Sequence, residues 1–296
     1  MRNFTTLAAF ALCACCVYGE SEANQYRQGA YGGDASDQYN LGVCYYKGIG
    51  VRKDRKEAAH WFRQSADQGN SDAEYALAIC YDNGQGVAED LVEAHWWYRK
   101  AAEHGCVDAQ YELARTFYQG KGVSVDRGKA FSWFREAAED GHLQAQFSLA
   151  WMWENGDGVE PNPKNAVYWY KKAAERGHLN SIKALGRCYY TGTGTPVNKA
   201  QGVKWVSKAA EQGDSESQLK MALYHWHGDG VDRNPDVAIA WLKQAAKNGN
   251  EEAKNLLTNG FASQKQKDQA KAPKCPGCGT SVSAGAKFCS ECGKRL

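Results

Sequence analysis

Hydrophobic and polar positions along residues 34–258 follow the spacing of amphipathic helices, and the whole pattern returns every 36 residues. In one unit the first apolar stripe comprises Ala109, Tyr111, Leu113, Ala114 and Phe117. The second stripe of the same unit comprises Ala130, Trp133, Phe134, Ala137 and Ala138. Each unit is therefore predicted to form two helices, and the pattern predicts six such units.

Glycine, aspartate and asparagine mark the ends of the predicted helices. Gly120 and Gly122 interrupt the pattern between the two helices of one unit, and Gly141 is predicted to follow the end of the second helix. Asp and Asn are preferred N-caps because their side-chain oxygens accept unpaired backbone N–H groups. One such residue precedes every second helix, namely Asp54, Asp90, Asp126, Asn162, Asn198 and Asn234.

Tryptophan also recurs once per unit, and we expect it to fill the space between neighbouring helices. The constant positions are Trp61, Trp97, Trp133, Trp169, Trp205 and Trp241. Four more tryptophans lie outside this position: Trp96, Trp151, Trp153 and Trp226. These four are either exposed anchors for a partner or packing residues between units, and the usual burial of aromatic rings favours packing.

A single helix pair cannot bury its apolar face alone, whereas six stacked pairs can. The predicted fold class is therefore all-α, an α-solenoid of six 36-residue helix–turn–helix repeats over residues 34–258. Residues 20–33 are predicted to form an N-terminal cap segment, and residues 249–258 repeat only a first helix, as a terminal cap does.

The stretch DAEYALAICYDNGQGVAEDLVEAHWWYRKAAEHG at 72–105, with its counterparts, resembles the Sel1-like repeat family, a relative of the tetratricopeptide repeat. The resemblance implies a non-enzymatic adaptor, and we expect it to bind a partner polypeptide on the concave surface lined by the first helices. The alternative is an exported enzyme acting on cell-wall or peptide substrates, an activity class reported for some relatives. Such an enzyme needs paired acid, base or nucleophile residues in a pocket, and the periodicity points to none.

The C-terminal residues 275–296 contain two C-x-x-C pairs, Cys275 with Cys278 and Cys289 with Cys292. Two such pairs supply a closed tetrahedral set of four thiolates, so one structural Zn²⁺ is predicted. The segment resembles the short zinc-ribbon modules found at the ends of many bacterial proteins. The alternative is two disulfides in an exported protein.

Residues 259–274 are polar and rich in lysine, which predicts a flexible linker before the zinc ribbon. The formal net charge of the whole chain is only +2, which argues against a protein built to coat nucleic acid. We therefore expect protein partners rather than nucleic acid or a small-molecule substrate.

Residues 1–19 have the layout of a secretory signal peptide, with Arg2 before an uncharged apolar run from Phe4 to Val17. The run Leu12-Cys13-Ala14-Cys15 also resembles a bacterial lipobox, which would place a lipid on Cys15 and attach the chain to a membrane. The predicted location is therefore exported: periplasmic, secreted or lipid-anchored. The alternative is a cytoplasmic protein with an N-terminal helix.

Three cysteines, Cys44, Cys80 and Cys188, share one position on the first helices. Stacked helices lie about 8–10 Å apart, whereas a disulfide needs Cα atoms within about 7 Å. Equivalent cysteines of adjacent units are therefore not expected to pair, and these thiols are interpreted as small buried apolar groups.

Overall fold

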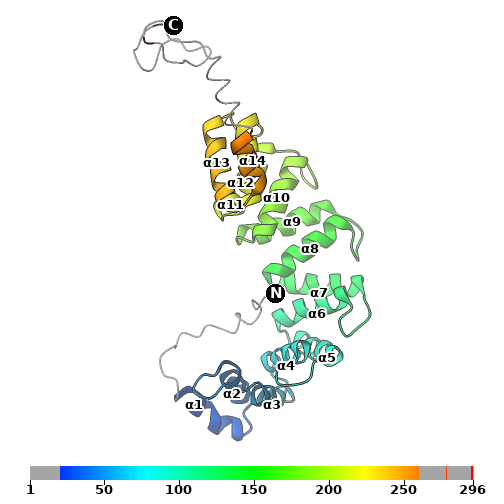
Figure 1. Ribbon diagram of the computed structural model, residues 1–296. Helices are drawn as coiled ribbons and strands as arrows, with labels where there is room; N and C mark the ends of the chain where they lie inside the picture. The colour runs from blue at the N-terminus through cyan, green and yellow to red at the C-terminus, as the bar shows by residue number, and fades with distance from the viewer. Residues whose placement is uncertain (1–20, 260–277, 279–294, 296) are drawn as a thin grey trace. The chain divides into compact units, whose positions relative to one another are not determined.

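A computed structural model describes residues 21–259 together with Cys278 and Arg295. Residues 21–259 form fourteen α-helices, which confirms the predicted helix pairs (Figure 1). The helices are α1 (Ser21–Tyr31), α2 (Ala35–Lys47), α3 (Arg55–Ala66), α4 (Ser71–Asn83), α5 (Leu91–Glu103), α6 (Val107–Gln119), α7 (Arg127–Glu139), α8 (Leu143–Asn155), α9 (Pro163–Glu175), α10 (Leu179–Thr191), α11 (Lys199–Glu211), α12 (Ser215–His227), α13 (Pro235–Lys247) and α14 (Glu251–Asn259).

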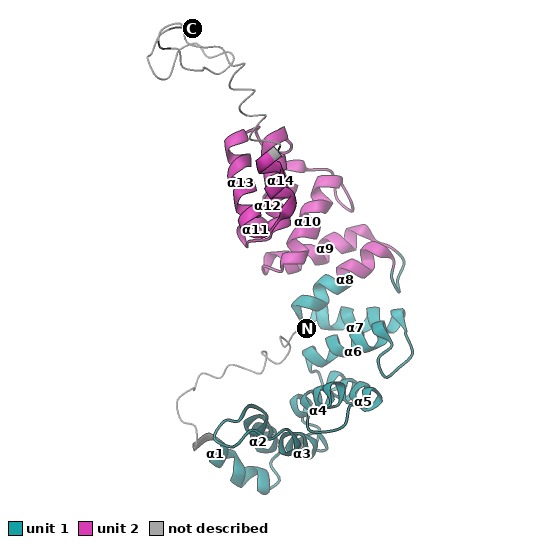
Figure 2. Cartoon of the chain, in the orientation of Figure 1, with its two compact units in different colours: residues 1–149, 157–160 teal, residues 150–156, 161–296 magenta. Residues whose placement is uncertain are grey.

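The helices belong to two compact units, coloured teal and magenta in Figure 2. Unit 1 contains residues 1–149 and 157–160, and unit 2 contains residues 150–156 and 161–296. The boundary falls inside α8, between Leu149 and Ala150. Within unit 1 each helix from α1 to α7 packs on the next, and the same holds in unit 2 from α9 to α14. Each unit is thus a stack with contacts between neighbours, as expected for an α-solenoid.

The segment predicted to cap the N-terminal end contains the helix α1, which packs on α2 as a second helix of a preceding repeat would. The shared core comprises Ala23, Ala30, Leu41, Cys44 and Trp61. At the other end, Ala253 of α14 is fully buried against a core that includes Leu242 of α13. Both terminal helices therefore cover apolar surface that a neighbouring repeat would otherwise cover.

The structure confirms all six predicted caps of the second helices. In α3, for example, the Asp54 carboxylate accepts hydrogen bonds from the backbone N–H groups of Lys56 and Glu57, at 2.9 and 3.2 Å. The same role falls to Asp90, Asp126, Asn162, Asn198 and Asn234. Pro163 and Pro235 occupy the first turn of α9 and α13, where the missing N–H costs nothing.

Side chains also cap the first helices except α6, and these caps follow residue preference less closely. Asn70 caps α4 by accepting from Ala73 N at 3.0 Å. His142 and His178 take the same place in α8 and α10, where their Nδ1 atoms accept from the backbone N–H groups three residues later. Histidine is not a usual N-cap, so these two caps could not be predicted from residue preference.

The two glycines between the helices of a repeat have different roles. Gly120 ends α6 in the left-handed conformation, with φ of 72°. Gly122 also has a positive φ, and a Cβ atom placed on it would lie 1.8 Å from the carbonyl oxygen of Leu91. The second glycine therefore allows the turn of one repeat to contact the second helix of the preceding repeat.

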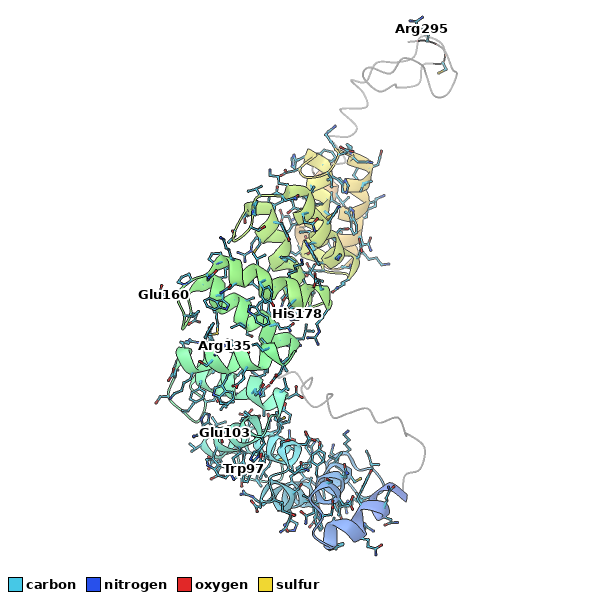
Figure 3. The ribbon with its side chains drawn as sticks, turned by 180° about the vertical axis from the view of Figure 1, so that it is seen from behind. Trp97, Glu103, Arg135, Glu160, His178 and Arg295 are labelled. Atoms are coloured by element: carbon cyan, nitrogen blue, oxygen red, sulfur yellow. The ribbon has the colours of Figure 1, made fainter. Side chains whose placement is uncertain are left out.

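Burial of the constant tryptophans varies more than the repeat predicts. Trp61, Trp97 and Trp205 are buried, whereas Trp133, Trp169 and Trp241 are only half-buried. Trp97 is 1% exposed, while Glu103 and Arg135 lie at the surface (Figure 3). Of the other tryptophans, Trp226 is buried, Trp153 is half-buried, and Trp96 and Trp151 are exposed. The repeat fixes a residue's place on its helix, and the side chains of the neighbouring helices decide its exposure.

None of the helices within residues 21–259 combines the length and the apolar character needed to cross a membrane.

Candidate functional sites on the first helices and in the cysteine-rich segment

Three tyrosines occupy one position on successive first helices of unit 1: Tyr39 on α2, Tyr75 on α4 and Tyr111 on α6. We call them the tyrosine row. Each ring packs on an aromatic ring of the second helix in its own repeat. The pairs and their ring-centroid separations are Tyr39–Phe62 at 5.9 Å, Tyr75–Tyr98 at 5.9 Å and Tyr111–Phe134 at 5.6 Å. The row therefore stands on rigid second-helix side chains, which hold the phenol rings in place.

The tyrosine row is partly accessible and uncharged. Tyr75 is 7% exposed, and Tyr39 and Tyr111 are half-buried. Burial, assisted by the Asp72 carboxylate, raises the pKa of Tyr39. Burial also raises the pKa of Tyr75, with smaller contributions from Glu112 and Asp108. At physiological pH these phenols stay protonated, so each hydroxyl can both donate and accept a hydrogen bond.

A polar cluster lies beside the row on α6. Glu112 is 8% exposed, and Arg115 Nη1 donates to its two carboxylate oxygens at 2.9 and 2.7 Å. Burial raises the pKa of Glu112 while the Arg115 charge opposes the shift. Tyr111 stacks on His142 with ring centroids 4.3 Å apart, and His142 Nε2 lies 3.5 Å from Asp108 Oδ1. These contacts fix the orientation of the guanidinium and of the last ring of the row.

The first helices α10 and α12 of unit 2 carry no aromatic residue at the position of the tyrosine row. At the position of the row, α10 carries Lys183 and α12 carries Leu219. Lys183 Nζ lies 3.2 Å from Asp214 Oδ1 and 2.7 Å from Glu216 Oε2. Hydrogen bonds from Lys183 and Lys220 lower the pKa of Glu216 to about 2. The two units therefore present chemically different surfaces on their first helices.

The cysteines of the repeats are buried thiols, as the sequence predicts. Cys44, Cys80 and Cys188 are at most 3% exposed. Burial raises the pKa of the Cys80 thiol to about 12 and that of Cys188 to about 11. Cys106 precedes α6 at the N-cap position without a side-chain cap bond, and burial raises its pKa to about 11. Thiols that stay protonated are poor nucleophiles, so these positions do not favour covalent catalysis.

The predicted zinc ligands fall almost entirely outside the described residues. Cys278 lies in a turn and is exposed, whereas Cys275, Cys289 and Cys292 lie outside the described part of the chain. Four cysteine sulfurs are nevertheless a donor set that suits a closed zinc site. Within residues 21–259, Cys278 and Arg295, no three His, Cys, Asp or Glu side chains come together as a metal site.

The predicted leader at 1–19, with Cys15, and the predicted linker from residue 260 onward also lie outside the described residues.

The sequence contains a signal for the tyrosine row, but the helix pattern does not distinguish the row from the core. Tyrosine recurs at 36-residue spacing at Tyr39, Tyr75 and Tyr111. The signal covers only the first three repeats and coincides with an apolar stripe. Periodicity alone therefore assigns these residues to the core.

Comparisons with known proteins agree with the fold. The Sel1 repeat model matches residues 35–70, 71–106, 107–142, 143–178, 181–214 and 215–250, and a zinc-ribbon domain model matches residues 274–296. A comparison with curated proteins found no match.

Among solved structures, the chain is similar to a protective antigen of uropathogenic Escherichia coli that displays an SLR fold. The identity is 38% over 81% of this chain and 52% of that chain, with a TM-score of 0.77. The chain thus spans about half the length of this relative. It is also similar to a Sel1 repeat protein from Oxalobacter formigenes, at 26% identity over 76% of this chain and 98% of that chain, with a TM-score of 0.66.

Sel1 repeat proteins generally act as protein-interaction scaffolds, and no enzyme family is indicated for the chain. Six in-phase helix pairs, their caps and the family match lead to one conclusion: the chain belongs to the Sel1 repeat family.

Proposed function

We propose that the chain is a non-enzymatic scaffold that binds a partner polypeptide on the first-helix face of unit 1, the surface of α2, α4 and α6 that carries the tyrosine row. The observation that supports this proposal is the row itself, three phenol rings held by second-helix aromatic side chains. Tyrosine combines a large contact area with few rotatable bonds, and it is enriched among the residues that dominate binding energy.

The polar side chains around the row suit a polypeptide. Asp72 and Asp108 accompany the tyrosines and can accept hydrogen bonds from backbone or side-chain donors of a partner. Arg115, with its side chain 35% exposed and oriented by Glu112, supplies donors. The aromatic rings of this face can make apolar contacts with an extended peptide. Its hydrogen-bond donors and acceptors can pair with the backbone and polar side chains of the same peptide.

Site-specific photo-crosslinking tests the proposal. A photoreactive residue at Ser36 or Asp72 lies three residues before Tyr39 or Tyr75, on the same side of its helix. We expect both positions to crosslink to one and the same protein in cells that express the native chain.

The matched control places the photoreactive residue at Ser132 or Glu136, which are exposed on the second helix α7. These positions should not crosslink to that protein. Equal crosslinking from both sets of positions would contradict binding at the first-helix face.

No observation favours the alternative that the chain is an exported enzyme acting on cell-wall or peptide substrates.

We further propose that Cys275, Cys278, Cys289 and Cys292 hold one structural Zn²⁺. The match of a zinc-ribbon domain to residues 274–296 supports this assignment, as does the sulfur donor set. Metal analysis and thiol titration of protein isolated from its native compartment provide the test. One zinc per chain is expected, and two disulfides without metal would overturn the assignment.

We propose that the chain is exported, on the basis of the apolar run between Phe4 and Val17. Intact mass and N-terminal sequencing of the mature protein distinguish cleavage after Gly19 from lipidation of Cys15. An unprocessed N-terminus in the cytoplasm would contradict export.

A further inference from the structure

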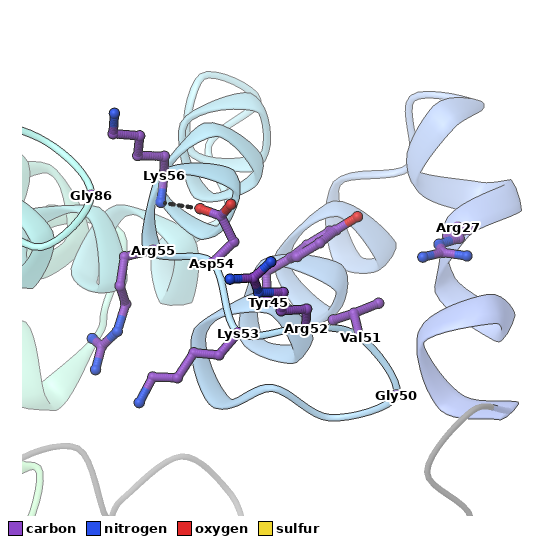
Figure 4. Close-up of a pocket in the computed structure, with 10 residues that line it drawn as sticks. All are labelled: Arg27, Tyr45, Gly50, Val51, Arg52, Lys53, Asp54, Arg55, Lys56 and Gly86. Carbon is purple, nitrogen blue, oxygen red and sulfur yellow. Dashed lines mark hydrogen bonds between the residues drawn. The ribbon is translucent and has the colours of Figure 1, made fainter.

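An unusual concentration of positive charge surrounds the turn between α2 and α3. Residues 52–56 contain four cations, Arg52, Lys53, Arg55 and Lys56, whereas none of the five equivalent turns contains more than one lysine or arginine. Arg27 of α1 faces the same space, and together these residues line a cavity of about 780 Å³ (Figure 4). The feature belongs to the first repeat alone, so the architecture of the fold does not require it.

Within the part of the chain that the structure describes, no ion pair neutralises the positive charge of this cavity. In the third and fifth repeats, the residues equivalent to Arg55 are paired with carboxylates, Arg127 with Asp157 at 3.6 Å and Lys199 with Asp229 at 2.8 Å. Arg55 instead lies 3.8 Å from the ring centroid of Tyr46 and donates to the neutral amide of Gln85.

The other cations of the cavity are equally unpaired. Arg27 donates to the neutral side chain of Asn24, and no cation of the cavity forms an ion pair with a carboxylate among the described residues. Among the described lining residues, only Asp54 carries a carboxylate, and it accepts the hydrogen bonds that cap α3. The lining therefore carries a positive charge that an anionic ligand can compensate.

The arrangement of the side chains indicates the size of the ligand. Lys53 and Lys56 point to opposite sides of the turn, and Arg27 approaches from a separate helix (Figure 4). Such spread cations do not converge on one compact anion. The lining also includes the half-buried side chains of Tyr45 and Val51. Cations interspersed with apolar contacts suit a polypeptide with acidic and apolar side chains.

We propose that this cavity, which we call the basic cavity, binds an acidic segment of a partner polypeptide. The contact is separate from the tyrosine row and does not depend on the function proposed for that row. It would give a scaffold a second docking point, and two linked contacts on one partner raise its overall affinity without further interactions.

Fluorescence anisotropy with the full chain tests the proposal. The probe is a fluorescein-labelled glutamate-rich peptide with one phenylalanine, and the matched peptide has glutamine in place of every glutamate. We expect the acidic peptide to bind in a salt-dependent manner and the glutamine peptide not to bind.

The triple variant R52Q/K53Q/K56Q should weaken binding of the acidic peptide by about tenfold, since it removes three cations from the lining of the basic cavity. Arg55 is left unchanged because it packs on Tyr46.

The control variant K204Q/K243Q/K247Q removes three exposed lysines of unit 2 and changes the net charge by the same amount. Its affinity for the acidic peptide should stay within about twofold of the parent chain. Equal weakening in both variants would show a general charge effect and overturn the proposal. Binding to phosphatidylglycerol vesicles or duplex DNA but not to the acidic peptide would also overturn it, and would assign the basic cavity to another class of anion.

Discussion

At the scale of single residues, Glu74 of α4 is a carboxylate at a position where four of the other five repeats carry glutamine. It occupies the position of Gln38, Gln146 and Gln218, whose Nε2 atoms donate to alanine carbonyl oxygens of the preceding helix at 3.2, 3.1 and 2.9 Å. Glu74 is fully buried, its Oε2 lies 2.8 Å from His104 Nδ1, and its Oε1 has no hydrogen-bond partner among the described residues. A carboxylate cannot donate the hydrogen bond that glutamine makes here, so an ionised Glu74 leaves this contact incomplete.

The substitution Glu74→Gln should therefore stabilise the protein, by about 1–3 kcal/mol where the carboxylate is ionised. Burial raises the pKa of Glu74 more than His104 lowers it. A carboxyl with a raised folded-state pKa contributes stability at low pH and loses that contribution as the pH rises through the folded pKa. The advantage of Glu74→Gln over the parent chain should accordingly grow with pH.

Urea midpoints measured by circular dichroism at several pH values between about 4 and 8 check this prediction. The double variant Glu74→Gln/His104→Gln is the control, because it recreates the pair of Gln38 and Gln68, whose side chains hydrogen bond at 2.7 Å. A difference between Glu74→Gln and the parent chain that shrinks as the pH rises would contradict the assignment.

Tryptophan burial leads to a second prediction at this scale. Trp97→Ala should cost about 3–5 kcal/mol, since it removes a large side chain that is 1% exposed. Trp96→Ala should cost less than about 1.5 kcal/mol, because Trp96 is 42% exposed and its contact with Trp97 is a single edge-to-face pair. Denaturant midpoints of the two variants check the difference, and equal losses would contradict the assignment of the core.

At the scale of helices and turns, local chemistry made the fold largely predictable. The six second-helix caps, the prolines after two of them and the glycine after each second helix follow from residue preferences that act over a few positions. Contacts between repeats were not predictable in the same way. Tyr118 Oη donates to Asp157 Oδ2 at 2.8 Å, and Arg127 lies 3.6 Å from the Tyr118 ring centroid. Residues 39 positions apart become neighbours only through stacking, which single-sequence patterns do not show.

The turn glycines give a prediction for this scale. Gly122→Ala should be more destabilising than Gly105→Ala by about 1–3 kcal/mol, the typical cost of overpacking. Both positions have a positive φ, so both variants strain the backbone, but only at Gly122 would the added Cβ collide with the Leu91 carbonyl. Apart from Gly105 and its two chain neighbours, no described residue has an atom within 4 Å of a Cβ placed there, which makes Gly105→Ala the matched control. Thermal or urea midpoints check the order, and a larger loss at Gly105 would contradict the proposed contact between repeats.

At the scale of the whole molecule, the repeat region and the zinc ribbon are expected to be independent. The repeats carry their own core up to α14, and the polar linker contains few apolar residues to join the two parts. Removing zinc with a chelator should unfold only residues 275–296. The helical circular dichroism signal and its urea midpoint should stay unchanged. A lower urea midpoint after chelation would contradict this prediction, because it would show that the zinc ribbon stabilises the repeats.

The candidate sites differ in how far the sequence alone predicts them. The four cysteines were evident because C-x-x-C spacing is itself the chemical signal. The tyrosine row and the basic cavity required three-dimensional information. Tyr39 and Tyr111 follow a core pattern yet remain half-buried, and the lack of a carboxylate beside Arg55 depends on Gln85 in the following repeat.

Binding of a protein partner to the first-helix face of unit 1 can be tested by measuring the affinity of the chain for the partner identified by crosslinking. Tyr39→Ala/Tyr111→Ala removes two accessible rings of the row, and isothermal titration calorimetry should show at least about tenfold weaker binding. The control Trp96→Ala/Tyr168→Ala removes two exposed rings of second helices and should leave the affinity within about twofold. Unchanged affinity in the tyrosine variant, with its helical content intact, would show that the first-helix face of unit 1 is not the binding surface.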